Sequence, residues 1–261
     1  MLIPTPLARY NQILEIVSSA PQGVSLSQLV ERGGLPRSTT HRLAASLCAA
    51  GYLKSQDNGH YVFGPALLEL LKRSLAASAT DYLPRTVLSS ITAELGETAF
   101  FARRVDKHID LLEAIPPEAS GRSYVYPGTG SRPVDTCSSS KAILAYVEDE
   151  TAKEIYEAYE KDNNAPSHDW LSFSRTLEEV RKNGIAICDG EIDEGVFSVA
   201  CPVIVANMPG LFSIGVVGPT ARMKEKSIDR LQSVVQAGAE KASAFISERM
   251  FRDSDKSRDG E

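Results

Sequence analysis

Residues 25–43 read SLSQLVERGGLPRSTTHRL and contain two short helical patterns separated by a pair of glycines. Ser25 is an N-cap residue, and Gln28 three positions later completes a capping box, so a helix is predicted to begin here. The dipeptide Gly33-Gly34 ends that helix. Pro36 is placed to begin the next helix, because its missing N–H costs nothing in a first turn. Two helices joined by a short, glycine-containing turn are typical of a helix-turn-helix.

The flanking segments complete a winged module. Apolar side chains recur at helical spacing over Leu7–Ser18, which predicts a helix with one buried face. After the helix-turn-helix, the strand-like runs 52–55 and 60–63 flank Asp57-Asn58-Gly59, and this turn chemistry predicts an antiparallel hairpin. The order of helices and hairpin predicts a winged helix-turn-helix domain over residues 1–64.

The helix that begins at Pro36 carries small polar and basic side chains at its N-terminal end, which enters the major groove in this motif. Such side chains contact base edges and phosphates. If Leu43 and Leu47 face the core, Thr40 is partly buried with them and its polar neighbours point outward. The hairpin adds a second region, since a wing reaches an adjacent phosphate or the minor groove. The DNA-contacting candidates are Arg37, Ser38, Thr39, His41 and Arg42 in the helix and Lys54, Asn58 and His60 in the wing.

Charge is distributed unevenly along the chain. The 261 residues carry a net charge of −6, yet residues 1–80 hold seven basic and four acidic side chains, a local charge of +3. A basic module on an acidic body is typical of a DNA reader joined to a separate regulatory domain. The expected partner of the basic module is therefore double-stranded DNA.

Composition and motif content argue against several other classes of protein. No run approaches the roughly 18 apolar residues of a membrane helix, and the N-terminus lacks the features of a secretory signal. The four cysteines are far apart and form no CxxC pair, which favours reduced thiols in a cytosol. We therefore expect a cytoplasmic protein without membrane attachment. The four histidines show no metal-ligand spacing, and no P-loop or dinucleotide-binding motif occurs, so neither a metal nor a cofactor is expected.

Beyond residue 80 the pattern changes to strands interleaved with helices, without an internal repeat. It predicts one mixed α/β sheet domain over 81–251, joined to the winged domain by a linker helix over 65–80. The charged residues 252–261 predict a disordered tail. The expected strands are 97–105, 108–115, 123–126, 184–188, 198–205 and 211–217, and the expected helices are 81–95, 139–147, 150–160, 176–183 and 226–251. The fold class is therefore α+β, an N-terminal winged helix-turn-helix plus a C-terminal mixed α/β domain.

Three segments of the N-terminal module carry a family pattern: Ile13-Leu14, residues 35–43, and Gly51-Tyr52-Leu53 leading to Tyr61–Gly64. On these segments, residues 7–75 resemble the DNA-binding domain of the IclR (isocitrate lyase regulator) family of bacterial transcription factors. That family favours a Leu-Pro-x-Ser-Thr-x-His/Tyr-Arg-Leu helix. The resemblance implies homodimers formed through this domain, often paired into homotetramers through the second domain, on pseudo-palindromic DNA operators.

The body of the chain carries further matches, at Gly96-Glu97-Thr98, at 138–142, between Gly184 and Pro202, and at Gly218–Arg222. Throughout 80–250 it resembles the GAF-like effector-binding domain of the same family. The resemblance implies a pocket for a small organic acid or a related metabolite. Its candidate lining residues are Tyr124, Ser138, Ser139, Asp189, Ser198, Gly215 and Val217.

The pocket implied by this resemblance departs from the family pattern. Ser138-Ser139-Ser140 replaces the usual glycine-containing turn, and Gly215 and Val217 stand where some members carry hydroxyl side chains. Serines that open a helix still favour a carboxylate, because free N–H groups and the helix dipole attract anions there. A less polar, roomier floor favours an organic acid with an apolar or aromatic body. Because Cys188 adjoins Asp189, an alignment shift of one residue stays open.

The expected function is a ligand-responsive transcriptional regulator that controls a catabolic operon, and not an enzyme. Two alternatives stay open. Ser138 and Lys141 have the serine–lysine spacing of β-lactamase-like hydrolases, although the companion Ser-Asp-Asn and Lys-Thr-Gly motifs are absent. The second alternative is an interaction module whose helix-turn-helix only dimerises, which the outward polar face of the third helix disfavours.

Overall fold

The computed structural model describes residues 6–20, 22–67, 69–71, 83–118, 123–163, 169–205 and 208–256. The chain divides into two compact units, Met1–Ser74 and Leu75–Glu261. The expected linker helix over 65–80 spans this division. Residues 65–67 and 69–71 are helical, and 72–80 fall outside the described residues.

The first unit is a helix-turn-helix with a small sheet. Its elements are α1 (Pro6–Ser18), β1 (Val24–Ser25), α2 (Leu26–Gly33), α3 (Arg37–Ala49), β2 (Leu53–Ser55) and β3 (His60–Phe63), in the strand order β1-β3-β2. The capping box of α2 is confirmed, since the Ser25 hydroxyl accepts from the Gln28 N–H and the Gln28 side chain accepts from the Ser25 N–H. Gly34 ends α2 in the left-handed conformation, with φ 60°.

One compact core positions α3 within this unit. It consists of Ile13, Val17, Val24, Leu29, Leu43, Ala44, Leu47 and Leu53. Thr40 is fully buried beside Leu43, and its hydroxyl donates to the Pro36 carbonyl at 3.2 Å. The sequence pattern did not indicate β1, which pairs with β3 through Val24 and Tyr61. These contacts bury one face of α3 and leave the opposite face in solvent.

The second unit contains a six-stranded antiparallel sheet in the order β6-β5-β4-β9-β8-β7. The strands are β4 (Thr98–Val105), β5 (His108–Ile115), β6 (Gly130–Ser131), β7 (Ala186–Asp189), β8 (Val196–Val205) and β9 (Met208–Pro219). The two longest strands, β8 and β9, are neighbours in the sheet and pair along most of their length. α10 packs on these two strands from one face of the sheet and α6 packs on them from the other.

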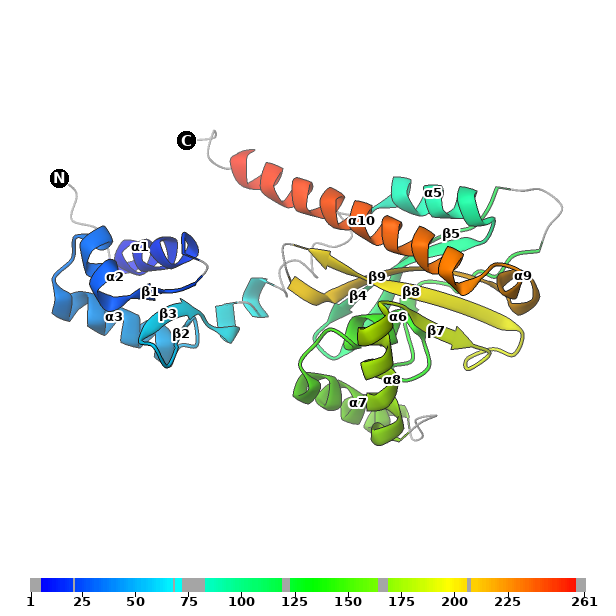
Figure 1. Cartoon of the computed structure of the whole chain (residues 1–261), viewed down its shortest axis with the longest axis horizontal. Helices are drawn as coiled ribbons and strands as arrows, with labels where there is room; N and C mark the ends of the chain where they lie inside the picture. Colours follow the sequence, from blue (N-terminus) through cyan, green and yellow to red (C-terminus); the bar gives the residue numbers. More distant parts are fainter. Residues whose placement is uncertain are drawn as a thin grey trace. The chain divides into compact units, whose positions relative to one another are not determined.

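Helices cover both faces of this sheet (Figure 1). One face carries α5 (Arg85–Leu95) and α10 (Ile228–Lys256), and the other carries α6 (Ser138–Leu144), α7 (Asp149–Asn163) and α8 (Trp170–Asn183). Each face has its own apolar core: Leu88 and Val235 pack with Phe101 on the first, and Ile143 and Phe173 pack with Phe100 on the second. The expected mixed α/β domain is therefore confirmed. The short helix α9 (Thr220–Lys224) follows β9 and was not expected.

Two helices begin more than two residues away from their expected starts. α5 begins at Arg85, directly after Pro84, because a proline is tolerated at a helix start and not inside the helix. α8 begins at Trp170, well before the expected Thr176. Asp169 sets this start, since its carboxylate accepts from a main-chain N–H of the first turn at 2.9 Å.

The expected strands 123–126 and 211–217 also differ from the structure. Residues 123–126 form no strand, and β6 lies at that edge of the sheet instead. Met208-Pro209-Gly210, expected as a turn, belongs to β9, and the connection from β8 at 206–207 lies outside the described residues. At the other end of the unit, α10 continues through Lys256, beyond Phe251 where we expected it to stop.

Candidate functional sites

The N-terminal half of α3 presents a polar and basic surface. Arg37, Ser38, His41 and Arg42 are exposed, and Thr39 is half-buried. Arg37 reaches back to the Ser27 hydroxyl of α2 at 3.5 Å. Arg42 forms no hydrogen bond or ion pair through its side chain with any described residue. Its charge is therefore available to a phosphate or a base edge.

The wing is formed by the β2–β3 hairpin. Lys54 and Asn58 are exposed and His60 is half-buried. The Asn58 side chain shapes the turn, because its carbonyl oxygen accepts from the His60 N–H at 3.0 Å, and Gly59 supplies the left-handed residue, with φ 75°. Lys54 pairs with no carboxylate in the described part of the chain, so its charge is not compensated there.

In the second unit, a row of small side chains crosses the face of the sheet beneath α6. The register pairs Cys188 with Ser198, Ser198 with Val217, and Val217 with Thr98. Because side chains alternate between faces along a strand, all four point to the same side as Ala200, which belongs to the core under α6. A short polar row therefore lies within a mainly apolar face.

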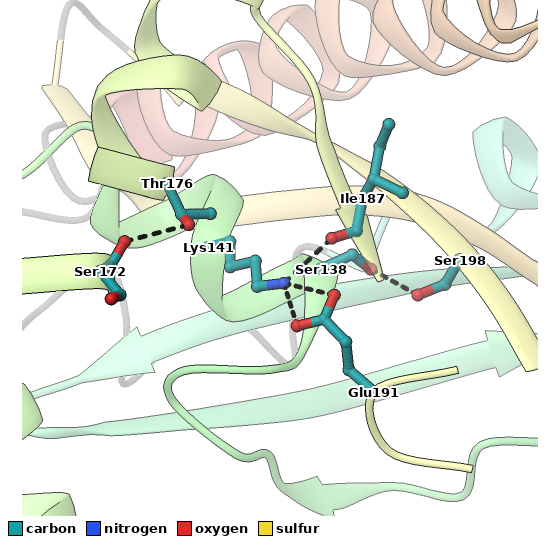
Figure 2. Close-up of polar contacts among 7 residues, drawn as sticks. All are labelled: Ser138, Lys141, Ser172, Thr176, Ile187, Glu191 and Ser198. Atoms are coloured by element: carbon teal, nitrogen blue, oxygen red, sulfur yellow. Dashed lines mark hydrogen bonds and ion pairs between the residues drawn. The ribbon is translucent and has the colours of Figure 1, made fainter. Parts of the chain in front are cut away.

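The first turn of α6 lies on this row. The Ser138 and Ser198 hydroxyls are 2.7 Å apart and form a buried hydrogen bond (Figure 2). Ser139 makes different contacts: its hydroxyl lies 3.1 Å from Cys137 Sγ, and its carbonyl accepts from the Ser213 hydroxyl at 3.1 Å. The structure thus brings Ser138 and Ser198 together directly, whereas Ser139 is used to fasten the start of α6.

Lys141, one turn after Ser138, forms an ion pair at the edge of the row (Figure 2). Its Nζ lies 2.7 and 2.6 Å from the two carboxylate oxygens of Glu191 and donates to the Ile187 carbonyl at 3.1 Å. The Lys141 side chain is 4% exposed and that of Glu191 26%. The carboxylate compensates the buried ammonium charge, so Lys141 is not an open anion-binding group.

Tyr124 lies on a segment that is fastened to the same end of the sheet. The Thr98 hydroxyl donates to the main-chain carbonyl of Val125 at 2.6 Å. Arg222 donates to the main-chain carbonyl of Ser123 at 3.0 Å. Arg222 also forms a bidentate pair with the buried carboxylate of Glu97, with N···O distances of 2.5 and 2.8 Å, and this pairing raises the pKa of Arg222. Tyr124 itself is 46% exposed, so it stands at the rim of the polar row.

Asp189 does not join this group. Its carboxylate pairs with Lys224 of α9 at 2.7 Å, and the alternation along β7 turns it to the opposite face from Cys188. Cys188 is the residue that the structure places beside Ser198. Burial and the neighbouring Glu191 carboxylate raise the pKa of the Cys188 thiol, so it contributes a neutral group.

Gly215 and Val217 make the sheet surface next to Ser198 apolar. A Cβ at Gly215 would overlap the Phe100 ring and the Val199 carbonyl, so this position cannot carry a side chain without repacking. Val217 is buried next to Ser198. Neither residue supplies a hydrogen-bonding side chain, so the Ser138–Ser198 pair lies beside an apolar part of the sheet surface.

The geometry disfavours a serine–lysine hydrolase. A general base must reach the proton of its nucleophile, yet Ser138 bonds to Ser198 while Lys141 bonds to Glu191 and Ile187. Within the described ranges, no three His, Cys, Asp or Glu side chains gather into a metal-binding group. No described helix is long and apolar enough to cross a membrane.

Comparison with known families agrees with this division of the chain. Residues 6–57 match the IclR helix-turn-helix domain. Residues 79–244 match the model described as Bacterial transcriptional regulator IclR C-terminal, which alone spans more than half of the chain. Both matches are to domains of transcriptional regulators and not of enzymes.

Individual proteins are similar over nearly the whole chain. The HTH-type transcriptional regulator TtgV of Pseudomonas putida is 28% identical over 224 residues, which cover 85% of this chain and 84% of that protein. The crystal structure of Thermotoga maritima IclR is 22% identical, with a TM-score of 0.56 and coverage of 92% and 98%. An IclR homolog from Microbacterium hydrocarbonoxydans, solved in complex with 4-hydroxybenzoate, is 19% identical, with a TM-score of 0.54 and coverage of 93% and 99%. The two structures share the fold of this chain.

Proposed function

Because this chain belongs to the IclR family of bacterial transcriptional regulators, we propose that it reads a pseudo-palindromic operator through α3 and changes its DNA affinity when a small organic acid binds beside Ser138 and Ser198. DNA-binding regulation of transcription follows from the family itself. The proposal adds the residues that read the operator, the chemistry of the ligand, and control of a catabolic operon by that ligand.

The exposed Arg42 carries the DNA-reading part of this proposal. It lies on the N-terminal half of α3, where a recognition helix meets the major groove, and no described carboxylate neutralises it. The contacting set is Arg37, Ser38, Thr39, His41, Arg42, Lys54, Asn58 and His60. Two copies of the chain, as a homodimer or within a homotetramer, place their α3 helices on half-sites about one helical turn, or a multiple of it, apart.

The DNA-reading part is tested by fluorescence anisotropy on the DNA upstream of the chain's own gene. Arg42→Ala is expected to weaken binding about tenfold or more and to lower the slope of log affinity against log salt by about one. Arg230→Ala, which removes the same charge from the second unit, is the matched control and is expected to leave both quantities unchanged. Unchanged affinity of Arg42→Ala at every salt concentration would remove Arg42 from the interface.

The ligand part is supported by the chemistry of the polar row. The Ser138 and Ser198 hydroxyls share one hydrogen bond, so the second hydroxyl hydrogen of the pair is available to a carboxylate. Val217 and Gly215 leave an apolar surface for the rest of the ligand. The nearby Lys141 is already compensated by Glu191, which disfavours a small, highly charged acid. An acid with an apolar or aromatic body fits these groups best, and the relative solved with 4-hydroxybenzoate binds a molecule of that class.

Coupling between the two units requires that the ligand favour one arrangement of the DNA-reading helices over another. The linker over residues 65–80 is the connection through which that preference acts. Ligand binding then changes the spacing of two α3 helices against the fixed spacing of the half-sites. Such a response suits the control of an operon for the breakdown of the acid that is sensed.

The ligand part is tested by thermal shift with 4-hydroxybenzoate, acetate and pyruvate. The aromatic acid is expected to raise the melting temperature of the wild type and not that of Ser198→Ala. The control is Ser174→Ala, which removes a half-buried hydroxyl that donates to the Leu171 carbonyl within α8. This variant is expected to respond as the wild type does. If acetate or pyruvate stabilises the protein and 4-hydroxybenzoate does not, the preference for an aromatic body is wrong.

A further inference from the structure

A cavity lies between the β5–β6 edge of the sheet and α7. Its volume is about 540 Å³, and its walls are Lys107, His108, Ile109, the segment 131–134, Ala158 and Tyr159. Small-molecule sites in proteins commonly measure about 300–1,000 Å³. In the strand order, β4 and β9 separate β5 from β8, which carries Ser198. This cavity, named here the Arg132 cavity, is therefore distinct from the site proposed above.

Arg132 is a fixed and uncompensated cation in the wall of this cavity. Its Nε donates to the carbonyls of Gly130 and Ser131 at 3.3 and 3.0 Å, and one terminal nitrogen donates to the Pro127 carbonyl at 3.0 Å. All three partners are neutral, and Arg132 pairs with no carboxylate in the part of the chain that is described. A guanidinium has five N–H donors, so donors remain for an anion.

Two further groups make the cavity basic. Lys107 stands in the turn that leads into β5, and its one described carboxylate contact is Glu154 at 3.7 Å. Both side chains of that pair are more than half exposed, at 51% and 61%, so water weakens the attraction. The adjacent His108 is exposed, and its ring makes no hydrogen bond with a described residue.

The rest of the wall is apolar or neutral. Ile109 and Val134 are buried, and Ala158 of α7 is half-buried. Burial, together with the charge of Asp135, raises the pKa of Tyr159, so its hydroxyl remains neutral near physiological pH. The cavity therefore combines a basic side with a side suited to an apolar group.

We propose that the Arg132 cavity binds a small organic anion, a carboxylate with an apolar body, at a site separate from the one beside Ser138 and Ser198. Three other arginines of this unit have carboxylate partners, in the pairs Arg85–Glu113, Arg181–Asp149 and Arg222–Glu97. Arg132 is held ready in one geometry and lacks such a partner, which is the situation in which a planar guanidinium binds a carboxylate well. This inference does not rest on the proposed regulatory ligand.

Benzoate and benzyl alcohol are the probes, because they share a ring and differ in charge. Each is titrated into the full-length protein while the His108 ring proton, assigned with His108→Gln, is followed by NMR. Benzoate is expected to shift this signal saturably, and benzyl alcohol is expected to bind at least about tenfold more weakly. Arg132→Met is expected to weaken benzoate binding by a similar factor. Lys107→Met is expected to weaken benzoate binding a few-fold. This variant keeps the hydrogen bonds that Arg132 donates to the Pro127, Gly130 and Ser131 carbonyls.

Two control variants separate this site from the regulatory one. Arg85→Met removes a cation elsewhere in the unit, and Ser198→Ala alters the polar row, and both are expected to keep the wild-type benzoate response at His108. If Ser198→Ala abolishes binding while Arg132→Met and Lys107→Met bind normally, the cavity proposal fails and the proposed function stands. The cavity proposal also fails if benzoate gives no saturable shift at His108, or if benzyl alcohol binds equally well. Lys107→Met provides the same test if Arg132→Met does not fold.

Discussion

Arg42 of the first unit and two ion pairs of the second unit use cationic side chains in opposite ways. On the helix-turn-helix, Arg42 is exposed and has no described partner. In the second unit, Lys141 pairs with Glu191 and Arg222 pairs with Glu97, and one member of each pair is almost fully buried. The first arrangement leaves charge for an external phosphate, whereas the second joins segments that are distant in sequence. An uncompensated cation thus indicates a binding surface, and a buried pair indicates a structural connection.

The largest expected effect comes from breaking the most buried pair. Arg222→Met leaves the Glu97 carboxylate, which is 1% exposed, without its partner. We expect the free energy of unfolding to fall by about 3–5 kcal/mol, measured by urea denaturation. Arg42→Ala removes an exposed cation and is expected to change it by less than about 0.5 kcal/mol. Equal losses in the two variants would contradict the comparison between the units.

A smaller effect is expected at the other pair. Glu191→Gln leaves the buried Lys141 ammonium without a carboxylate, and the free energy of unfolding is expected to fall by about 2 kcal/mol. The matched control is Glu154→Gln, at an exposed pair with Lys107, where a loss below about 0.5 kcal/mol is expected.

The same Glu191 variant is expected to bind 4-hydroxybenzoate more tightly, because Lys141 then lacks its own carboxylate. Weaker binding by a stably folded variant would mean that Glu191 supports the ligand instead.

The smallest expected effect concerns a core thiol. Burial raises the pKa of Cys201 from 9.0 to about 12, so the folded chain keeps this proton at a pH where the unfolded chain loses it. Stability from this thiol is therefore complete below pH 9 and is lost as the pH rises toward 12, with a slope of at most about 1.4 kcal/mol per pH unit. Cys201→Ala is expected to flatten the fall in urea midpoint between pH 9 and pH 10.5. An unchanged slope would contradict this assignment.

A thiol in the first unit gives the matched comparison. Cys48 is half-buried in the helix-turn-helix, and burial raises its pKa as well. Cys201 is 1% exposed. Iodoacetamide at pH 9 is therefore expected to label Cys48 in the folded protein well before Cys201, as read by peptide mass spectrometry. Equally fast labelling of the two thiols would show that Cys201 is not shielded in the folded chain.

The first unit could be predicted closely from sequence because its signals are local. Ser25 and Gln28 form the capping box within four positions, Gly34 ends α2, and Gly59 closes the hairpin. Each feature depends on neighbours in the chain and on backbone preferences. The one element that was missed there, β1, depends on pairing with a strand far along the chain.

The candidate ligand site in the second unit depends on distant contacts, which local patterns do not contain. Lys141 and Glu191 are 50 residues apart, and Glu97 and Arg222 are 125 apart. The spacing of Ser138 and Lys141 left a hydrolase open as an alternative, because the sequence does not show that Glu191 is the carboxylate partner of Lys141. Only the fold reveals that this lysine is compensated.

The sequence pointed to Asp189 as a pocket residue, whereas the structure places Cys188 beside Ser198. This difference has a simple physical cause. A shift of one residue along a strand moves a side chain to the opposite face. Residues 185–188 are all apolar or nearly so, so their pattern does not indicate which of them face α6. The pairing of Cys188 with Ser198 decides the question.

One experiment tests most directly whether the first unit binds DNA while the second unit binds the ligand. It measures DNA affinity and ligand-induced stabilisation on the same two variants. Arg42→Ala is expected to lose operator affinity about tenfold or more while keeping the full rise in melting temperature with 4-hydroxybenzoate. Ser198→Ala is expected to keep operator affinity and lose that rise. The account is contradicted if Arg42→Ala binds the operator as the wild type does, or if Ser198→Ala loses DNA binding and keeps its response to the acid.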